Sequence, residues 1–124
     1  MPRRGADASC TRLKRKGAEA EDQALLFLLS RGLQLRTRNY ACRMGEIDLV
    51  MQDGAALVFV EVRQRSSGAY GGAAQSITAR KRARLIAAAR HFLAREGTQP
   101  PCRFDAVLVD AKQQLEWIRD AFGE

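Results

Sequence analysis

Residues 45–65, GEIDLVMQDGAALVFVEVRQR, contain two β-rich runs on either side of Asp53-Gly54. An Asp-Gly pair between alternating apolar residues is a strong signal for a β-hairpin. With a four-residue loop at residues 53–56, Gln52 faces Leu57, and this pairing fixes the register of the whole hairpin. One side of the predicted hairpin is then wholly apolar and holds Ile47, Leu49, Met51, Val58, Val60 and Val62.

The other side of the predicted hairpin gathers charge at one end. Asp48 faces Glu61 there, and Glu46 faces Arg63 beside them. Directly opposed residues have Cβ atoms about 4.5–5.5 Å apart, so the two carboxylates would repel each other unless a cation lay between them. A two-residue loop would leave Asp48 and Glu61 diagonal on this side. A three-residue loop would separate them, but it would also mix Asp48 with the apolar valines.

Residues 17–31 are expected to form a helix, because acids lie near their start and a glycine follows their end. The apolar stripe of this helix contains Glu21, which is followed at i+3 and i+7 by Ala24 and Leu28. The carboxylate of Glu21 is therefore expected on the face that points to the core. The alternative is a first-turn acid that only stabilises the helix N-terminus.

The remaining pattern completes an α/β domain. The further elements expected are a strand at 33–39, a basic loop at 40–44, an amphipathic helix at 78–96, a core strand at 103–110 and a short strand at 115–118. The order is then helix, three strands, helix, and one or two strands. This order predicts a single domain, residues 17–124, with a mixed β-sheet flanked by helices.

Charge divides the chain into an arm and a body. The chain has 21 Lys and Arg residues against 14 Asp and Glu residues, a formal net charge of +7. Residues 1–16 contain six basic residues and one acid, so most of the excess lies in this segment. A basic, disordered arm on a nearly neutral body is typical of proteins that contact phosphates, although a solubilising tail would have the same composition.

Composition excludes several classes of protein. With 46% hydrophobic and 28% charged residues, the chain is neither wholly disordered nor a coiled coil. We find no apolar run long enough to span a membrane and no signal-peptide core, so we expect a cytoplasmic protein without a membrane partner. The three cysteines form no CxxC pair, which predicts reduced thiols and disfavours a zinc site.

The converging carboxylates suggest a site for a hard divalent cation. Mg²⁺ (or Mn²⁺) takes oxygen ligands, often one or two carboxylates together with waters and phosphate oxygens, and Asp48 and Glu61 can supply them. Arg63 is expected on the same side as Glu61, where its guanidinium would steady a phosphate. Arginine keeps its proton in proteins, so Arg63 cannot act as a base.

Other residues are candidates for contacts with nucleic acid or for accessory roles. Each also has a structural explanation, such as surface solvation, a loop anchor or a pair with a neighbouring side chain. The phosphate-contact candidates are Arg65, Arg80, Lys81 and Arg84, Tyr70 could stack on an unpaired base, and Glu46 and Gln75 are possible accessory residues.

Several motifs together resemble one family. They are GEIDLV at 45–50, FVEVRQR at 59–65, YGGAAQSITARKR at 70–82, RFDAVLV at 103–109, and the pattern G-x-x-x-E-x-x-A that begins at Gly17. The chain resembles, over nearly its whole length, the YraN-like family of small uncharacterised bacterial proteins. That family is similar to PD-(D/E)xK nucleases, near the archaeal Holliday-junction resolvases.

The resemblance implies a restriction-endonuclease-like fold and a Mg²⁺-dependent site. Asp48 and Glu61 match the motif acids, Arg63 stands at the position of the motif Lys, and Glu21 matches the helix-borne acid of the resolvases. The implied activity is endonucleolytic cleavage of structured or branched DNA, favoured over RNA, by a possible homodimer. Because Arg63 replaces the motif Lys, a non-catalytic nucleic-acid-binding module or a protein adaptor is the alternative.

Overall fold

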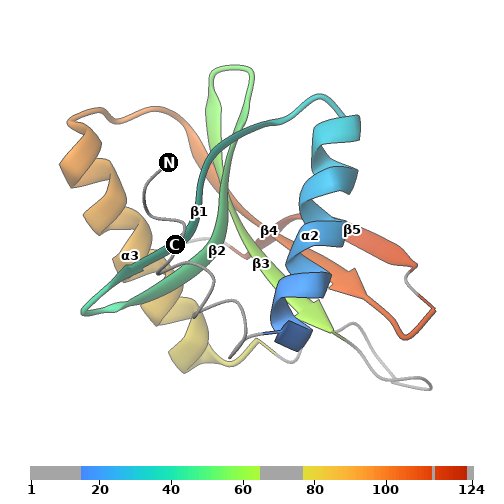
Figure 1. Ribbon diagram of the computed structural model, residues 1–124. Helices are drawn as coiled ribbons and strands as arrows, with labels where there is room; N and C mark the ends of the chain where they lie inside the picture. The colour runs from blue at the N-terminus through green and yellow to red at the C-terminus, as the bar shows by residue number, and fades with distance from the viewer. Residues whose placement is uncertain (1–14, 65–76, 113, 123–124) are drawn as a thin grey trace, which may run out of the picture.

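The computed structural model describes residues 15–64, 77–112 and 114–122, and Figure 1 shows a sheet with a helix on either side of it. The elements are α2 (Arg15–Ser30), β1 (Gln34–Cys42), β2 (Gly45–Asp53), β3 (Ala56–Gln64), α3 (Ala79–Glu96), β4 (Cys102–Val109) and β5 (Leu115–Phe122). The strands lie in the order β1-β2-β3-β4-β5; β3 and β4 run parallel, and the other neighbours are antiparallel. The predicted mixed sheet and element order are confirmed. None of the described helices has both the length and the apolarity needed to cross a bilayer.

Two apolar layers hold the helices on the sheet. Ala20, Ala24 and Leu28 of α2 recur every four residues and pack on one side of the sheet. Leu85 and Phe92 of α3 pack on the other side. Each helix therefore buries a single stripe, and the sheet lies between the two hydrophobic clusters that contain these stripes.

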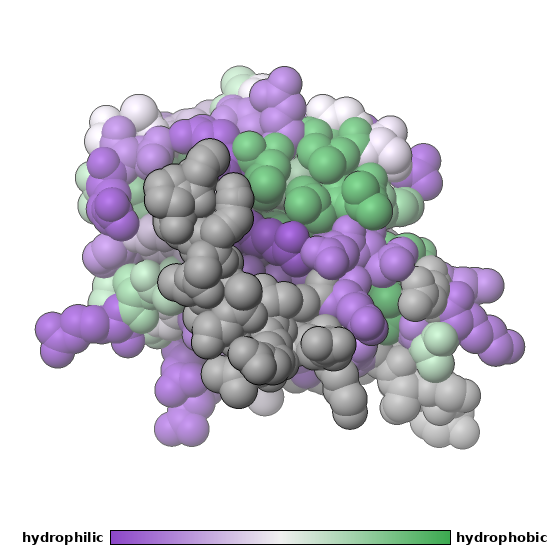
Figure 2. Space-filling view, in the orientation of Figure 1, coloured by the Kyte–Doolittle hydropathy of each residue, from purple (hydrophilic) through white to green (hydrophobic). Residues whose placement is uncertain are grey.

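The outward side of α2 remains apolar in places. Leu26 is 65% exposed and Leu29 is 42% exposed. Figure 2 shows apolar side chains together in the region where α2 lies in Figure 1. The packing of α2 on the sheet thus leaves some of its leucines in contact with solvent.

The hairpin of β2 and β3 has the predicted register near its loop. Gln52 pairs with Leu57, and the ladder continues to the pair of Leu49 and Val60. Asp53 also pairs with the first residue of β3, so the loop is two residues tighter than predicted and consists of residues 54 and 55. The register itself is unchanged.

Two predicted boundaries are wrong. Residues 40–42 belong to β1 and not to a loop, because Tyr40 pairs with Ile47 of β2. The Tyr40 ring also packs edge-on against the Phe92 ring, with 5.2 Å between the two ring centroids. The last strand continues past residue 118 to Phe122, which pairs with β4. The predicted basic arm lies almost wholly in residues 1–14, outside the described residues, and α2 begins two residues before the predicted start.

The predicted apolar side of the hairpin is wrong at one residue. Leu49 and Met51 pack in the cluster beside α2, whereas Ile47 packs in the cluster beside α3. On the neighbouring strand, Asn39 of β1 lies between the residues that pair with Leu49 and Ile47, and it has a φ of 56°. The strict alternation of a regular strand is therefore interrupted around Asp48.

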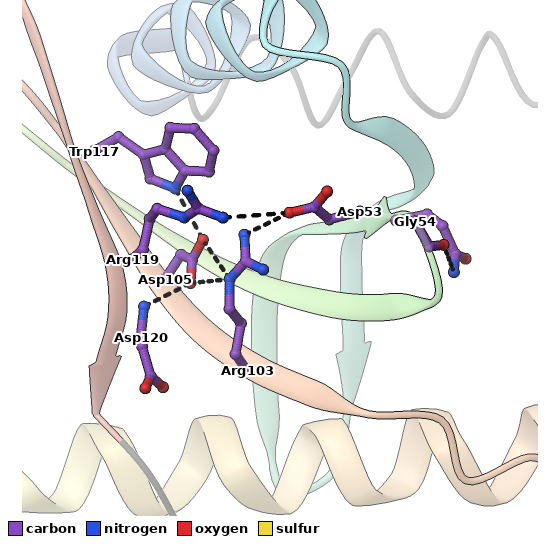
Figure 3. A network of polar contacts seen from close by, with 8 residues as sticks. Asp53, Gly54, Arg103, Asp105, Trp117, Arg119 and Asp120 are labelled. Atoms are coloured by element: carbon purple, nitrogen blue, oxygen red, sulfur yellow. Dashed lines mark hydrogen bonds and ion pairs between the residues drawn. The ribbon is translucent and has the colours of Figure 1, made fainter.

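A buried carboxylate joins the last two strands. Asp105 of β4 is fully buried and accepts hydrogen bonds from Arg103 Nε (3.0 Å), Trp117 Nε1 (2.8 Å) and the Asp120 amide (2.9 Å) (Figure 3). Arg103 also lies 3.0 Å from Asp53 at the end of β2. The network therefore ties the β2–β3 hairpin to β4 and β5.

Replacing the buried carboxylate should destabilise the fold strongly. In Asp105→Ala, the donors from Arg103, Trp117 and the backbone would lose their acceptor inside the protein. We expect the free energy of unfolding to fall by about 2–4 kcal/mol. Urea denaturation followed by circular dichroism measures this loss.

Glu96→Ala provides the matched control. Glu96 forms an ion pair with Arg36 at 2.6 Å, but both side chains are more than a third exposed. Its removal should lower the free energy of unfolding by less than about 1 kcal/mol. Equal losses in the two variants would contradict a structural role for the Asp105 network.

Candidate functional site

Four elements meet around an open hollow of about 390 Å³, which we call the acidic hollow. Its polar lining comes from α2, β2, β3 and α3. The residues that line it are Ala20, Glu21, Asp48, Glu61, Val62, Arg63, Gln64 and Lys81. All four residues predicted to be catalytic, Glu21, Asp48, Glu61 and Arg63, are thus in one place.

Asp48 lies where the hairpin ladder ends. Past the last pair, Leu49 and Val60, the Asp48 carboxylate accepts a hydrogen bond from the Val62 amide at 2.8 Å. Asp48 and Glu61 therefore line the same hollow without being ladder partners, which corrects the predicted direct pairing. The side chain of Asp48 holds β2 to β3 at the point where both strands present acids.

Burial raises the pKa of both strand acids. The pKa of Asp48 is raised to about 6: burial is the largest cause, the nearby Glu21 adds to the rise, and the Val62 amide and Lys81 act against it. Burial and the charge of Asp48 raise the pKa of Glu61, while Lys81 and Arg63 lower it. The fold therefore holds two acids at a position where their charged forms are unfavourable.

Lys81 is the closest described cation to Glu61. Its Nζ lies 3.1 Å from Glu61 Oε2, whereas Arg63 Nη1 lies 3.6 Å from the same oxygen. Lys81 is in the first turn of α3, which Thr78 caps by accepting a hydrogen bond from the Lys81 amide. Sequence analysis predicted Lys81 as a phosphate contact and missed its contact with Glu61. The Thr78 cap was the available signal, because it fixes where α3 begins.

The contact of Arg38 in β1 with two acids of α2 was also not predicted from the sequence. Arg38 Nε lies 3.5 Å from Glu21 Oε1, and Arg38 Nη2 lies 2.6 Å from Asp22 Oδ1. Glu21 itself is largely buried and faces the hollow, as its place on the helical stripe predicted. The contact depends on β1 lying beside α2, and no local pattern in the sequence indicates that juxtaposition.

The other candidates lie elsewhere. Glu46 and Arg84 line a neighbouring hollow that also includes Lys81. Arg80 is exposed in the first turn of α3 and does not line the acidic hollow. The predicted roles of Arg65, Tyr70 and Gln75 concern residues outside the described ones.

The donor set of the acidic hollow suits a hard cation only in part. In the described ranges, no three carboxylate, imidazole or thiol side chains gather closely enough to hold a metal ion. Asp48 and Glu61 can still supply two oxygen ligands, with water and phosphate oxygens completing the shell, as is usual for Mg²⁺. The residues therefore fit an ion that binds together with its substrate better than a permanently held one.

Comparison with known proteins places the chain among close relatives. A model of the family described as "Uncharacterised protein family UPF0102" matches residues 20–109. A "UPF0102 protein" of Nitrosomonas eutropha is 54% identical over 111 residues, covering 90% of this chain and 96% of the relative. One of Methylobacillus flagellatus is 54% identical over 113 residues, covering 90% and 99%. The predicted membership of a family of small uncharacterised bacterial proteins is confirmed.

The raised pKa of Asp48 predicts a pH-dependent gain of stability in Asp48→Asn. The folded protein keeps the carboxyl proton up to about pH 6, whereas an ordinary aspartate loses it near 3.8. Wild-type stability should therefore fall, relative to the variant, as the pH rises from 4 to 7. At pH 7 we expect Asp48→Asn to be more stable by about 1–3 kcal/mol, measured by denaturation at both pH values.

Asp22→Asn is the matched control for this measurement. Asp22 is an exposed residue in the middle of α2 and forms an ion pair with Arg38. Its replacement should change the free energy of unfolding by less than about 1 kcal/mol and should not stabilise the protein. An Asp48→Asn variant that is less stable than the wild type at pH 7 would contradict the unfavourable burial of Asp48.

Proposed function

The chain belongs to the uncharacterised protein family UPF0102, and we propose that its activity is the metal-dependent hydrolysis of phosphodiester bonds in structured or branched DNA. One observation carries the proposal. Glu21, Asp48 and Glu61 converge with two cationic side chains on a single open hollow. Acids that meet at such a site despite the cost of burial are typical of functional sites.

The proposed cofactor is Mg²⁺ or Mn²⁺. Asp48 and Glu61 would hold the ion, and Glu21 would contribute a further oxygen or fix a water near it. Such an ion, when bound, activates a water molecule and offsets the negative charge that develops on a phosphodiester. The hydrogen bond from the Val62 amide keeps the Asp48 carboxylate directed to the hollow throughout.

The two cations of the hollow have separate roles in this proposal. Arg63 presents a planar guanidinium, which can hold two oxygens of one phosphate and cannot serve as a base. Lys81 balances the charge of Glu61 and would also contact a phosphate oxygen in the hollow. Both side chains would stabilise negative charge on the reacting phosphate electrostatically, without taking part in proton transfer.

Further parts of the proposal concern partners. Arg80 and Arg84 of α3 and the basic arm of residues 1–16 would contact phosphates along the substrate without reading its bases. The resemblance to resolvases favours DNA over RNA and a two-fold homodimer. A cytoplasmic location, expected from the sequence, fits a DNA substrate.

A non-catalytic nucleic-acid-binding module is the second candidate function. It is favoured by Lys81, which already forms an ion pair with Glu61 at 3.1 Å, and by Arg63 at the position of the motif Lys. In this case binding would fall steeply with salt and would persist with a chelator and in Asp48→Ala. Cleavage would be absent under all conditions.

Cleavage assays test the proposed activity directly. Labelled duplex, flap, four-way-junction and single-stranded DNA are incubated with the protein and Mg²⁺ or Mn²⁺, with a chelator arm alongside. We expect cleavage only with metal, and a rate at least about 100-fold lower in Asp48→Ala and Glu61→Ala, since each change removes a carboxylate of the hollow. The second readout is binding of Mn²⁺, which the same variants should weaken.

A matched pair on α2 controls for general charge effects. Glu21→Gln changes a side chain of the hollow, whereas Glu19→Gln changes an exposed acid on the same helix. The first should lower the cleavage rate and the second should not. Activity that persists in Asp48→Ala would indicate a contaminating nuclease and would overturn the assignment.

A further inference from the structure

A second hollow adjoins the acidic hollow, and we call it the basic hollow. It encloses about 360 Å³ between residues 42–46 at the β1–β2 turn and the α3 residues Lys81, Arg84 and Leu85. Lys81 lines both hollows. The two cavities are therefore neighbours that share one cationic side chain.

The charge of the basic hollow differs from that of its neighbour. It is lined by three cations, Arg43, Lys81 and Arg84, and by one acid, Glu46. Lys81 also contacts Glu61 in the acidic hollow. Arg43 and Arg84 are both exposed, so their guanidinium groups can reach a ligand in the cavity. The excess of positive charge favours an anion.

The basic hollow is built on a close contact between two elements. A Cβ atom on Gly45 would lie 3.0 Å from the Arg84 carbonyl oxygen and 3.1 Å from the Arg84 Cβ, so the start of β2 rests directly on α3. This contact holds the turn that carries Arg43 at a fixed distance from the helix that carries Arg84. The two arginines are thus carried by backbone segments that pack closely against each other.

We infer that the basic hollow binds a phosphodiester of the same nucleic-acid strand that the acidic hollow engages. Glu46 and Asp48 lie two residues apart on β2, roughly 7 Å. Successive phosphates of one strand in duplex DNA advance about 3.4 Å along the helix axis. A strand that passes the acidic hollow would therefore bring a phosphate one or two nucleotides away into the basic hollow.

This inference rests on the proposed function and adds how the substrate strand is held beside the acidic hollow. A site that needs a neighbouring phosphate takes a polynucleotide rather than a mononucleotide. Arg43 and Arg84 would contact backbone oxygens, which carry no sequence information, so the binding is independent of base sequence.

A pair of double variants with equal charge tests the inference. Arg43→Ala with Arg84→Ala removes two charges at the basic hollow, and the Ala side chain keeps the Cβ that contacts Gly45. Arg90→Ala with Arg95→Ala removes two charges from exposed positions farther along α3. Fluorescence anisotropy measures the binding of each variant to labelled single-stranded and duplex oligonucleotides. The measurements are repeated over a salt series with chelator present.

We expect the variant at the basic hollow to lose at least about 10-fold in affinity, and the slope of log K against log salt to decrease by about 1–2. The control pair should lose less than about 3-fold. Arg43→Lys with Arg84→Lys keeps both charges and should keep most of the slope. Melting temperatures close to that of the wild type verify that the variants fold.

The outcomes separate this inference from the proposed function. Equal losses in the two double variants, or no oligonucleotide binding by the wild type, would overturn the inference even if cleavage occurs. Absent cleavage together with a selective loss in the Arg43/Arg84 variant would overturn the nuclease and leave the inference intact. A competing mononucleotide or inorganic phosphate should displace the oligonucleotide only weakly; displacement at a similar concentration would instead indicate a site for free phosphate.

Discussion

The hydrogen bond from the Val62 amide to the Asp48 carboxylate is the contact on which the site depends. It joins β2 to β3 just past the last ladder pair. Asp48 of β2 and Glu61 of β3 therefore line one hollow without pairing directly with each other. The bond partly offsets the cost of burying the Asp48 charge, and the nearby Lys81 offsets a further part of it. The part of the burial cost that is not offset lowers the stability of the folded protein. Such a loss of stability is common where a site must bind a charged ligand.

Much of this arrangement could be predicted from the hairpin sequence. The alternation of apolar residues fixed which side chains share a face, because a shift of the pairing by one residue would have put valines with acids. That register brought Asp48 and Glu61 to one end of the hairpin, and the helical spacing of Glu21 brought a third acid to the same end. These predictions depended on the two-residue period of a strand and the 3.6-residue period of a helix. Both periods can be recognised within a short segment of sequence.

The missed features depend on contacts between segments distant in the sequence. The partner of Glu61 is Lys81, and the partner of Glu21 is Arg38, and both pairs form only after separate elements have packed on the sheet. The change of side at Ile47 coincides with the positive φ of Asn39 on the neighbouring strand. A positive φ at one residue does not appear in the alternation of apolar and polar residues, so the sequence pattern could not predict it. Asparagine tolerates a positive φ better than most residues do.

The Asp105 network also bears on the order in which the protein can become stable. The donors to this buried carboxylate come from positions 103, 117 and 120, and the last of them is near the end of the chain. Until β5 joins the sheet, the Asp105 side chain of β4 has an incomplete set of hydrogen-bond partners. During synthesis, the hairpin that carries the acids would therefore gain its full support only after β5 has left the ribosome.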